Sequence, residues 1–214
     1  MNDVSNRRPL ASRDTAWAGR ISRWLAGTGI TPNQISMLGM VSAALAFASF
    51  WAAGGSSGSL RILLLLLGAG FTQGRLLCNL FDGMVAIEAQ KRAADGGFWN
   101  EFPDRISDVL ILMGLALGAG EPSLGWAATA FAFLTAYTRE LGVSCGLAAD
   151  FSGPMAKQHR MAVVTGAALL TIFAPLFGGR DEVLVAALWV VAVGAALTAL
   201  RRAVHLVAGL RRRG

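Results

Sequence analysis

The chain alternates long apolar runs with short polar segments, and six of the runs approach the length of a membrane span. They occupy residues 35–53, 60–78, 106–119, 124–148, 161–177 and 183–200. A helix needs roughly 20 residues to cross the hydrocarbon core, and the third run reaches that length only if it extends back through the polar residues before it. No run alternates as a strand of a membrane barrel would. The pattern predicts an all-α integral membrane protein with a six-transmembrane-helix bundle.

A seventh, amphipathic helix is expected before the first run. Trp17, Ile21, Trp24 and Leu25 recur at helical spacing with arginines between them. Trp and Arg both prefer the depth of the lipid headgroups, which favours an interfacial helix over a polar tail with incidental tryptophans. Thr31 is a candidate N-cap, and Pro32 suits the first position of the helix that follows. We expect a tail and interfacial helix over residues 1–30 and a transmembrane domain over 31–214.

Composition and charge agree with a membrane protein. Of the 214 residues 54% are hydrophobic and 15% are charged, and the mean hydropathy is +0.53, which excludes a disordered chain. The net charge is +6, but the basic residues are scattered beside the membrane runs without a nucleic-acid-binding motif. We therefore expect contacts with membrane lipids and none with nucleic acid. Their distribution predicts a multi-pass protein of the cytoplasmic (inner) membrane with both termini in the cytoplasm.

Acidic residues mark the candidate site. Asp82, Asp104 and Asp108 lie at the edges of apolar runs, where a charge costs at least a few kcal/mol and usually has a function. Three negative side chains cannot neutralise one another, so we expect a cation. Oxygen ligands favour Mg²⁺, Mn²⁺ or Ca²⁺.

The spacing of these residues predicts two facing helices. In helical conformation Asn79, Asp82, Gly83 and Ala86 share one face, and Asn100, Asp104 and Asp108 share another. A short loop between antiparallel helices would turn the two faces together. Gly83 and Ala86 have almost no side chain, so a bulky group could lie against the first helix. The prediction is a metal cluster beside a flat slot, near one membrane surface.

Basic residues suggest a neighbouring anion site. Lys157 and Arg160 are one turn apart at the start of a predicted helix, after Gly153 and Pro154. The positive end of the helix adds to their charge, which favours an anion site over two cations that only set topology. Arg139, in the fourth run, either snorkels to the interface or forms a pocket wall.

The motifs resemble those of the CDP-alcohol phosphatidyltransferase (phosphotransferase) family, D-x-x-D-G-x-x-A-R followed after a spacer by G-x-x-x-D-x-x-x-D. Asp82-Gly83-x-x-Ala86 and Asp104-x-x-x-Asp108 match, and the resemblance covers nearly the whole chain. A pattern this long is far more specific than a short motif. The chain departs from it at three positions, where Asn79, Ile87 and Asn100 replace Asp, Arg and Gly. Asn79 resembles a bacterial subgroup with asparagine there. It leaves open whether one or two metal ions bind, since asparagine can ligate through its carbonyl oxygen.

The resemblance implies transfer of a phosphatidyl group from a CDP-alcohol, expected to be CDP-diacylglycerol, to the hydroxyl of a small polar acceptor, with release of CMP. The metal, Mg²⁺ or Mn²⁺, would be held by Asn79, Asp82, Asp104 and Asp108, and Asp108 would also be the catalytic base. The CDP-alcohol would contact Gly83, Ala86, Asn100 and Arg105. A phosphorylated acceptor would contact Arg139, Lys157 and Arg160. A homodimer with its active site toward the cytoplasm is expected.

Two other functions remain open. The departures at Asn79 and Ile87 favour a catalytically inactive membrane scaffold or partner subunit. An ion or metabolite carrier is less favoured, because the carboxylates cluster near one surface and not at the midplane. The acceptor could be glycerol 3-phosphate, an inositol phosphate, serine or another polyol.

Overall fold

A computed structural model describes residues 15–88 and 95–213, apart from the side chains of Asn100 and Phe177. All regular elements in these ranges are helical. They are α1 (Ala16–Gly27), α2 (Pro32–Gly55), α3 (Gly58–Glu88), α4 (Gly96–Gly118), α5 (Pro122–Ser144), α6 (Lys157–Thr171), the short 3-10 helix η3 (Ala174–Phe177) and α7 (Glu182–Arg211).

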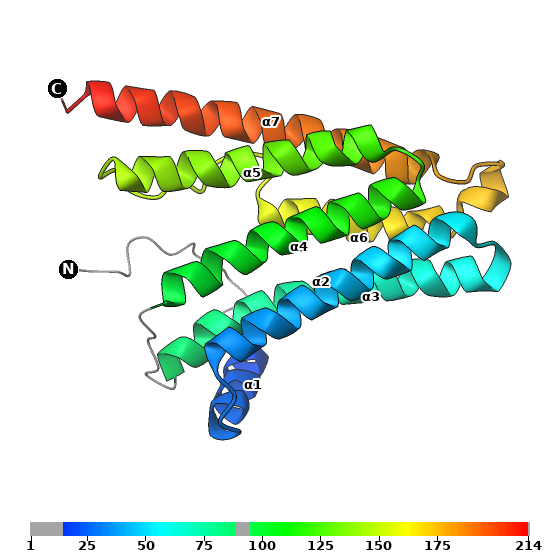
Figure 1. Cartoon of the computed structure of the whole chain (residues 1–214), viewed down its shortest axis with the longest axis horizontal. Coiled ribbons are helices and arrows are strands. Elements are labelled where there is room, and N and C mark those ends of the chain that lie inside the picture. The colour runs from blue at the N-terminus through cyan, green and yellow to red at the C-terminus, as the bar shows by residue number, and fades with distance from the viewer. Residues whose placement is uncertain (1–14, 89–94, 214) are drawn as a thin grey trace.

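The six helices α2 to α7 form one bundle, as the apolar runs predict. Figure 1 shows successive helices running in opposite directions, with α1 and the C-terminal end of α7 at the same end of the bundle. Within the described residues, α2, α3 and α7 are long and apolar enough to cross a membrane by length and composition. Helices α4 and α5 have 23 residues each but carry charged residues, and α6 has 15. The chain is a multi-pass membrane protein of all-α fold.

The start of α2 follows from its sequence. Gln34 N–H donates to Thr31 Oγ1 at 3.2 Å, and Thr31 N–H donates to Gln34 Oε1 at 2.9 Å. These reciprocal bonds form a capping box, and Pro32 occupies the first turn, where a missing N–H costs nothing. The predicted N-cap at Thr31 is confirmed.

Helix α1 packs beside the motif-bearing end of α3. Ala18 and Ser22 are buried, whereas Trp17, Ile21 and Trp24 remain exposed, as expected for a helix that presents an apolar side to lipid. Trp17 also packs edge-on against Phe81 of α3, with ring centroids 6.1 Å apart. The helix therefore supports the segment that carries Asp82. The division of the chain at residue 30 stays a prediction.

Glycines bring α4 very close to α2. A Cβ atom on Gly114 would lie 2.5 Å from the Cα of Phe47, and one on Gly118 would lie 2.2 Å from the backbone oxygen of Phe50. Two small residues four apart let two helical backbones approach, as in many membrane bundles. This contact fixes how α4 is rotated and thus where its aspartates point.

Helix α6 begins inside the bundle. Figure 1 shows its start further in than the neighbouring ends of α5 and α7. The preceding residues Met155 and Ala156 are buried, and the N–H of Met155 donates to Thr198 Oγ1 of α7 at 2.9 Å. Gly153, with φ +120°, has no room for a side chain against Thr198. The chain thus folds inward before α6 starts, which places Lys157 and Arg160 at depth.

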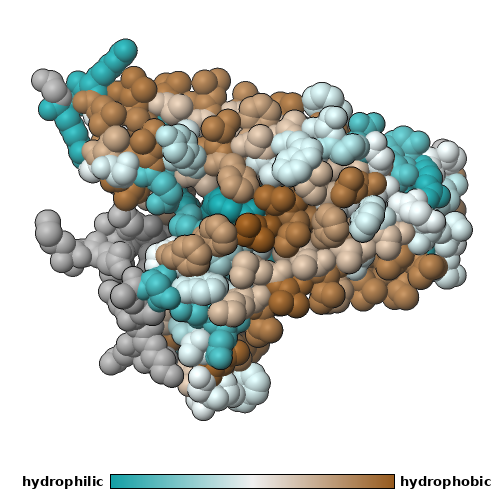
Figure 2. All heavy atoms as spheres, in the orientation of Figure 1, coloured by the Kyte–Doolittle hydropathy of each residue, from teal (hydrophilic) through white to brown (hydrophobic). Residues whose placement is uncertain are grey.

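Helix ends differ from the predicted runs where the chain leaves regular helix. The fifth run was expected to reach residue 177, but α6 ends at Thr171 and the chain continues into η3, whose first turn contains a proline. Helix α7 continues past the apolar run to Arg211. Figure 2 shows broad hydrophobic areas along the bundle, and hydrophilic residues in a hollow at the end where α5 and α7 diverge from α2 and α3.

Candidate active site

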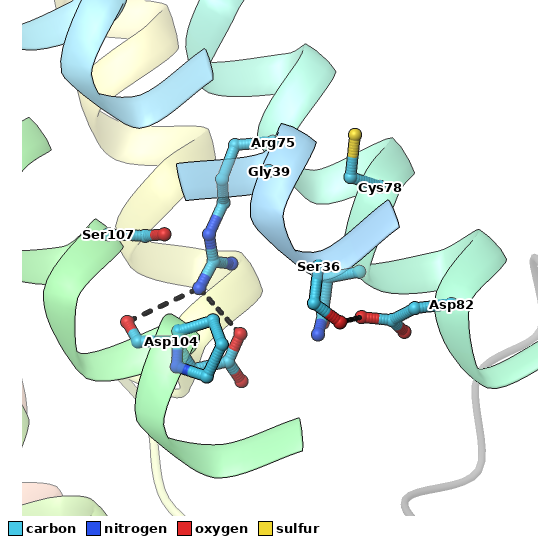
Figure 3. Close-up of a pocket in the computed structure, with 9 residues that line it drawn as sticks. Ser36, Gly39, Arg75, Cys78, Asp82, Asp104 and Ser107 are labelled. Atoms are coloured by element: carbon cyan, nitrogen blue, oxygen red, sulfur yellow. Dashed lines mark hydrogen bonds and ion pairs between the residues drawn. The ribbon is translucent and has the colours of Figure 1, made fainter. Parts of the chain in front are cut away.

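Helices α2, α3 and α4 enclose a small polar pocket (Figure 3). Its lining residues are Ser36, Gly39, Arg75, Cys78, Asn79, Asp82, Pro103, Asp104 and Ser107. Three of the four predicted metal ligands, Asn79, Asp82 and Asp104, line it. The two motif segments therefore face each other, as their helical spacing predicts.

Asp82 is held by a serine from α2. Ser36 Oγ donates to Asp82 Oδ2 at 2.8 Å, and the aspartate is 6% exposed. Its other oxygen, Oδ1, is buried and has no hydrogen-bond partner among the described residues. A buried carboxylate oxygen without a partner is costly, so this atom is suited to bind a cation.

Asp104 is paired with an arginine of α3. Arg75 Nη2 donates to Asp104 Oδ1 at 2.7 Å and to the backbone oxygen of Asp104 at 3.3 Å (Figure 3). Arg75 is only 1% exposed, and its Nη1 has no partner among the described residues. It therefore fixes Asp104 and leaves one donor in the pocket region.

Lys157 bridges the two motif helices. Its Nζ donates to Asn79 Oδ1 on α3 and to Asp104 Oδ2 on α4. Together with Arg75, it engages both carboxylate oxygens of Asp104. The ammonium group thus lies between two residues that were predicted to ligate a metal ion.

Asp108 has a different partner and does not line the pocket. Arg160 Nη2 lies 2.6 Å from Asp108 Oδ2, and Arg160 Nη1 donates to the backbone oxygen of Met155 at 3.1 Å. The Oδ1 atom of Asp108 is buried without a partner among the described residues. One carboxylate oxygen of Asp108 is therefore bound to Arg160, and the other is available to a ligand.

Two of the three aspartates have counter-charges within the protein, although the sequence pointed to a bound cation for all three. Asp104 pairs with Arg75 and Lys157, and Asp108 pairs with Arg160. Asp82 has no ion-pair partner among the described residues. The spacing of the two acidic motifs does not reveal these pairs, because the cations come from one turn before the first motif and from a helix 50 residues further on.

The pocket residues fit one hard divalent cation. No group of three or more histidine, cysteine, aspartate or glutamate side chains in residues 15–88 and 95–213 is arranged to hold a metal. However, Asn79, Asp82 and Asp104 line one pocket and offer only oxygen atoms, the ligands that Mg²⁺ and Mn²⁺ prefer. The buried, unpartnered Oδ1 of Asp82 also fits a cation ligand. A ligand role for Asp108 stays a prediction.

Arg105 and Arg139 share Glu101. Arg105 Nη2 lies 3.0 Å from Glu101 Oε2, and Arg139 Nη2 donates to the same oxygen. Arg139 also contacts its neighbour Glu140 at 2.8 Å, and its guanidinium lies 5.5 Å from the ring centre of Phe151. Arg139 is therefore held by ion pairs and does not snorkel freely, but it does not line the pocket, so its place in a pocket wall stays a prediction.

The predicted donor-binding residues are only partly brought together. Gly83 and Ala86 are half-buried on α3, next to Asp82, and Ile87 is exposed. Arg105 lies one residue from Asp104, with 3.9 Å between Nη2 and Asp104 Oδ2. The side chain of Asn100 lies outside the described residues.

Sequence reasoning missed Ser36 and Arg75. Arg75 had a detectable signal, because it is a charge inside a run taken as apolar and lies four residues before Asn79, on the same helical face. Ser36 had none, because a single serine in an apolar helix is common and only tertiary packing brings it to Asp82.

Comparisons with known proteins agree with this architecture. No protein-family model matches the chain. It is 29% identical over 199 residues to the phosphatidylinositol phosphate synthase of Streptomyces avermitilis, covering 85% of this chain and 74% of that protein. It is 35% identical over 99 residues to the archaetidylinositol phosphate synthase of Pyrococcus horikoshii, covering 46% of this chain and 47% of that protein. The match thus spans about half the length of the archaeal relative.

Solved structures share the fold. The phosphatidylinositol phosphate synthase of Mycobacterium tuberculosis with CDP-DAG bound superimposes with a TM-score of 0.73 at 23% identity, covering 90% of this chain and 94% of that one. Its complex with manganese and citrate gives the same TM-score, with 89% and 88% covered. The chain is therefore a multi-pass membrane protein with the fold of this synthase, and its sequence is similar to those of two synthases of inositol phosphate lipids.

Proposed function

We propose that the protein is a CDP-alcohol phosphatidyltransferase that moves a phosphatidyl group from CDP-diacylglycerol to a hydroxyl of a phosphorylated polyol and releases CMP. The observation that carries the proposal is the polar pocket itself, where Asn79, Asp82 and Asp104 meet between α3 and α4. Two further findings support it. The fold is that of an enzyme solved with CDP-DAG, and two sequence relatives are named for inositol phosphate lipids. We therefore infer an inositol phosphate as the acceptor.

In this proposal the chain positions both substrates and moves one proton. A divalent ion, Mg²⁺ or Mn²⁺, held by Asp82 with Asn79 and Asp104, would neutralise negative charge that develops on the departing CMP phosphate. The cytidine diphosphate would lie over Gly83 and Ala86, while the acyl chains stay among lipid tails. Arg75 Nη1, a buried donor without a partner in the described residues, suits a phosphate oxygen.

Asp108 is the proposed base. Arg160 holds Oδ2 at 2.6 Å, so Oδ1 is the atom left to accept the acceptor's hydroxyl proton. The acceptor oxygen then bonds to the phosphorus that carries diacylglycerol, and the bond from that phosphorus to the CMP oxygen breaks. Arg139, Lys157 and Arg160 would attract the acceptor's phosphate. A homodimer with its active site toward the cytoplasm completes the proposal.

One observation favours a second function, a catalytically inactive membrane scaffold. Asp104 and Asp108 form ion pairs with Arg75, Lys157 and Arg160, and these pairs can hold the helices together without chemistry. The test is release of CMP from CDP-diacylglycerol in detergent, with Mn²⁺ and a panel of inositol phosphate, glycerol 3-phosphate, inositol and serine. We expect release with inositol phosphate. No release with any acceptor, from a protein that binds CDP-diacylglycerol, would support the scaffold.

A further inference from the structure

We propose that Lys157 is a built-in replacement for one metal ion, so that each chain binds a single divalent cation and not a pair. The inference rests on the proposed function, in which the aspartate motifs hold divalent metal. In this inference, the ammonium group of Lys157 provides one of the positive charges of that site.

The position of the ammonium group is the first argument. Nζ of Lys157 contacts oxygen atoms of Asn79 and Asp104 from two different helices, as a bridging metal ion would. Arg75 engages the other carboxylate oxygen of Asp104. Each carboxylate oxygen of Asp104 therefore already binds one cationic side chain, and Asp104 keeps lone pairs for one divalent ion shared with Asp82 but not for a second, bridging ion while Lys157 remains. The open oxygen in the pocket is Oδ1 of Asp82.

Charge is the second argument. An aspartate with a divalent cation carries a local charge of −1 + 2 = +1, and an asparagine with an ammonium carries 0 + 1 = +1. The chain has Asn79 in place of the first motif aspartate, and Lys157 contacts that same side chain. The two changes together preserve the local charge, whereas Asn79 alone would weaken binding of a divalent ion.

The backbone supports a permanent position for the lysine. Lys157 is the first residue of α6, and the residues before it are anchored by Met155 N–H to Thr198 Oγ1 at 2.9 Å. Arg160 Nη1 donates to the backbone oxygen of Met155 at 3.1 Å. The start of α6 is thus fixed from both sides, and the Lys157 side chain is only 21% exposed. The backbone of Lys157 is thus fixed at a depth from which its side chain reaches both oxygens.

The experiment counts Mn²⁺ ions on the full-length protein in detergent, by electron paramagnetic resonance of free Mn²⁺ during titration. We expect one ion per chain for the wild type and for Asn79→Asp, in which the ammonium still occupies the bridge. The Asn79→Asp/Lys157→Met variant should bind two, the second with an affinity at least tenfold above that of any further Mn²⁺ taken up by Asn79→Asp alone. Arg201→Met, which removes one exposed positive charge elsewhere, is the control and should bind one.

Two ions, or none, on the wild type would overturn the proposal without any variant. A folded double variant that keeps its first ion and gains no second would also overturn it. The count is independent of turnover, so the two proposals fail separately. One Mn²⁺ per chain with no CMP release contradicts the proposed function and leaves the lysine assignment. CMP release from a chain that binds two ions supports the proposed function and contradicts the lysine assignment.

Discussion

Arg160 and Asp108 form an almost fully enclosed ion pair, with 2.6 Å between Nη2 and Oδ2 and side chains that are 2% and 1% exposed. The two residues are 52 positions apart and belong to α6 and α4. A pair at this depth links the two helices. It also orients the oxygen that we assign to proton transfer.

Loss of the arginine alone should therefore destabilise the fold. We expect Arg160→Met to lower the free energy of unfolding by about 3–5 kcal/mol, because it leaves a buried carboxylate without its counter-charge. The Asp108→Asn/Arg160→Met variant should recover part of this loss, since neither charge then remains. Reversible unfolding in mixed micelles measures both. An Arg160→Met protein as stable as the wild type would show that Asp108 is compensated elsewhere.

Replacement of the base should reduce turnover more than binding. In Asp108→Asn an oxygen remains for Arg160, so the helices stay linked while the proton acceptor is lost. We expect kcat for CMP release to fall by about 10² to 10⁴, the usual effect of a positioned base. The affinity for CDP-diacylglycerol should stay within about tenfold of the wild type. Lost donor binding that recovers at high Mn²⁺ would instead make Asp108 a metal ligand.

Activity should require a divalent cation and the charge of Asp82. Excess EDTA should abolish CMP release, and Mg²⁺ or Mn²⁺ should restore it. Asp82→Asn should be inactive although it can still accept the hydrogen bond from Ser36, because the negative ligand oxygen is gone. Ser36→Ala, the matched control, keeps the carboxylate and should retain measurable activity. Full turnover of the wild type in excess EDTA would contradict the metal site.

Arg139 should act on the acceptor and not on the donor. We expect Arg139→Ala to raise the acceptor KM about tenfold, roughly 1.4 kcal/mol, which is close to the lower end of the range for a hydrogen bond to a charged group. The donor KM should change less, as for loss of ground-state binding. Glu140→Gln removes the exposed neighbour of Arg139 and is the control. If the acceptor KM is unchanged in both variants, Arg139 only anchors Glu101.

The glycine contact between α2 and α4 gives a test of the fold alone. Gly114→Ala would place a methyl group 2.5 Å from the backbone of Phe47, so the helices must separate. We expect a loss of about 1–3 kcal/mol, as for other overpacked sites. Gly70→Ala meets no atom within 4 Å and should be neutral or slightly stabilising. Unfolding temperatures of both variants, measured in the same detergent, test this prediction. Equal values would show that α2 and α4 are not closely packed at Gly114.

Local signals in the sequence predicted much of this architecture. Thr31 and Pro32 predicted the start of α2, and the spacing of Asn79 and Asp82 predicted their shared face, because both depend on residues within one turn. The partners of the aspartates could not be predicted in this way. Ser36, Lys157 and Arg160 reach the site through helix packing, and no spacing along the chain encodes that.

The inward start of α6, by contrast, depends on tertiary packing and not on local sequence. The depth of Lys157 depends on how the segment before it packs against α7, through Gly153, Met155 and Thr198. The sequence shows a glycine, a proline and a helix start, which fit equally well at the membrane surface. Only the packed structure places the first turn of α6 among the aspartates.

Helix α6 is also too short for the layer that surrounds it. Its 15 residues rise about 22 Å, whereas the hydrocarbon core is roughly 30 Å thick. Helix α6 falls short of the full thickness at the end where the charged groups gather. We therefore expect the hydrocarbon core to be thinner there and water to reach these groups. Water-soluble and lipid-soluble compounds could then meet at one depth, each without leaving the phase in which it dissolves.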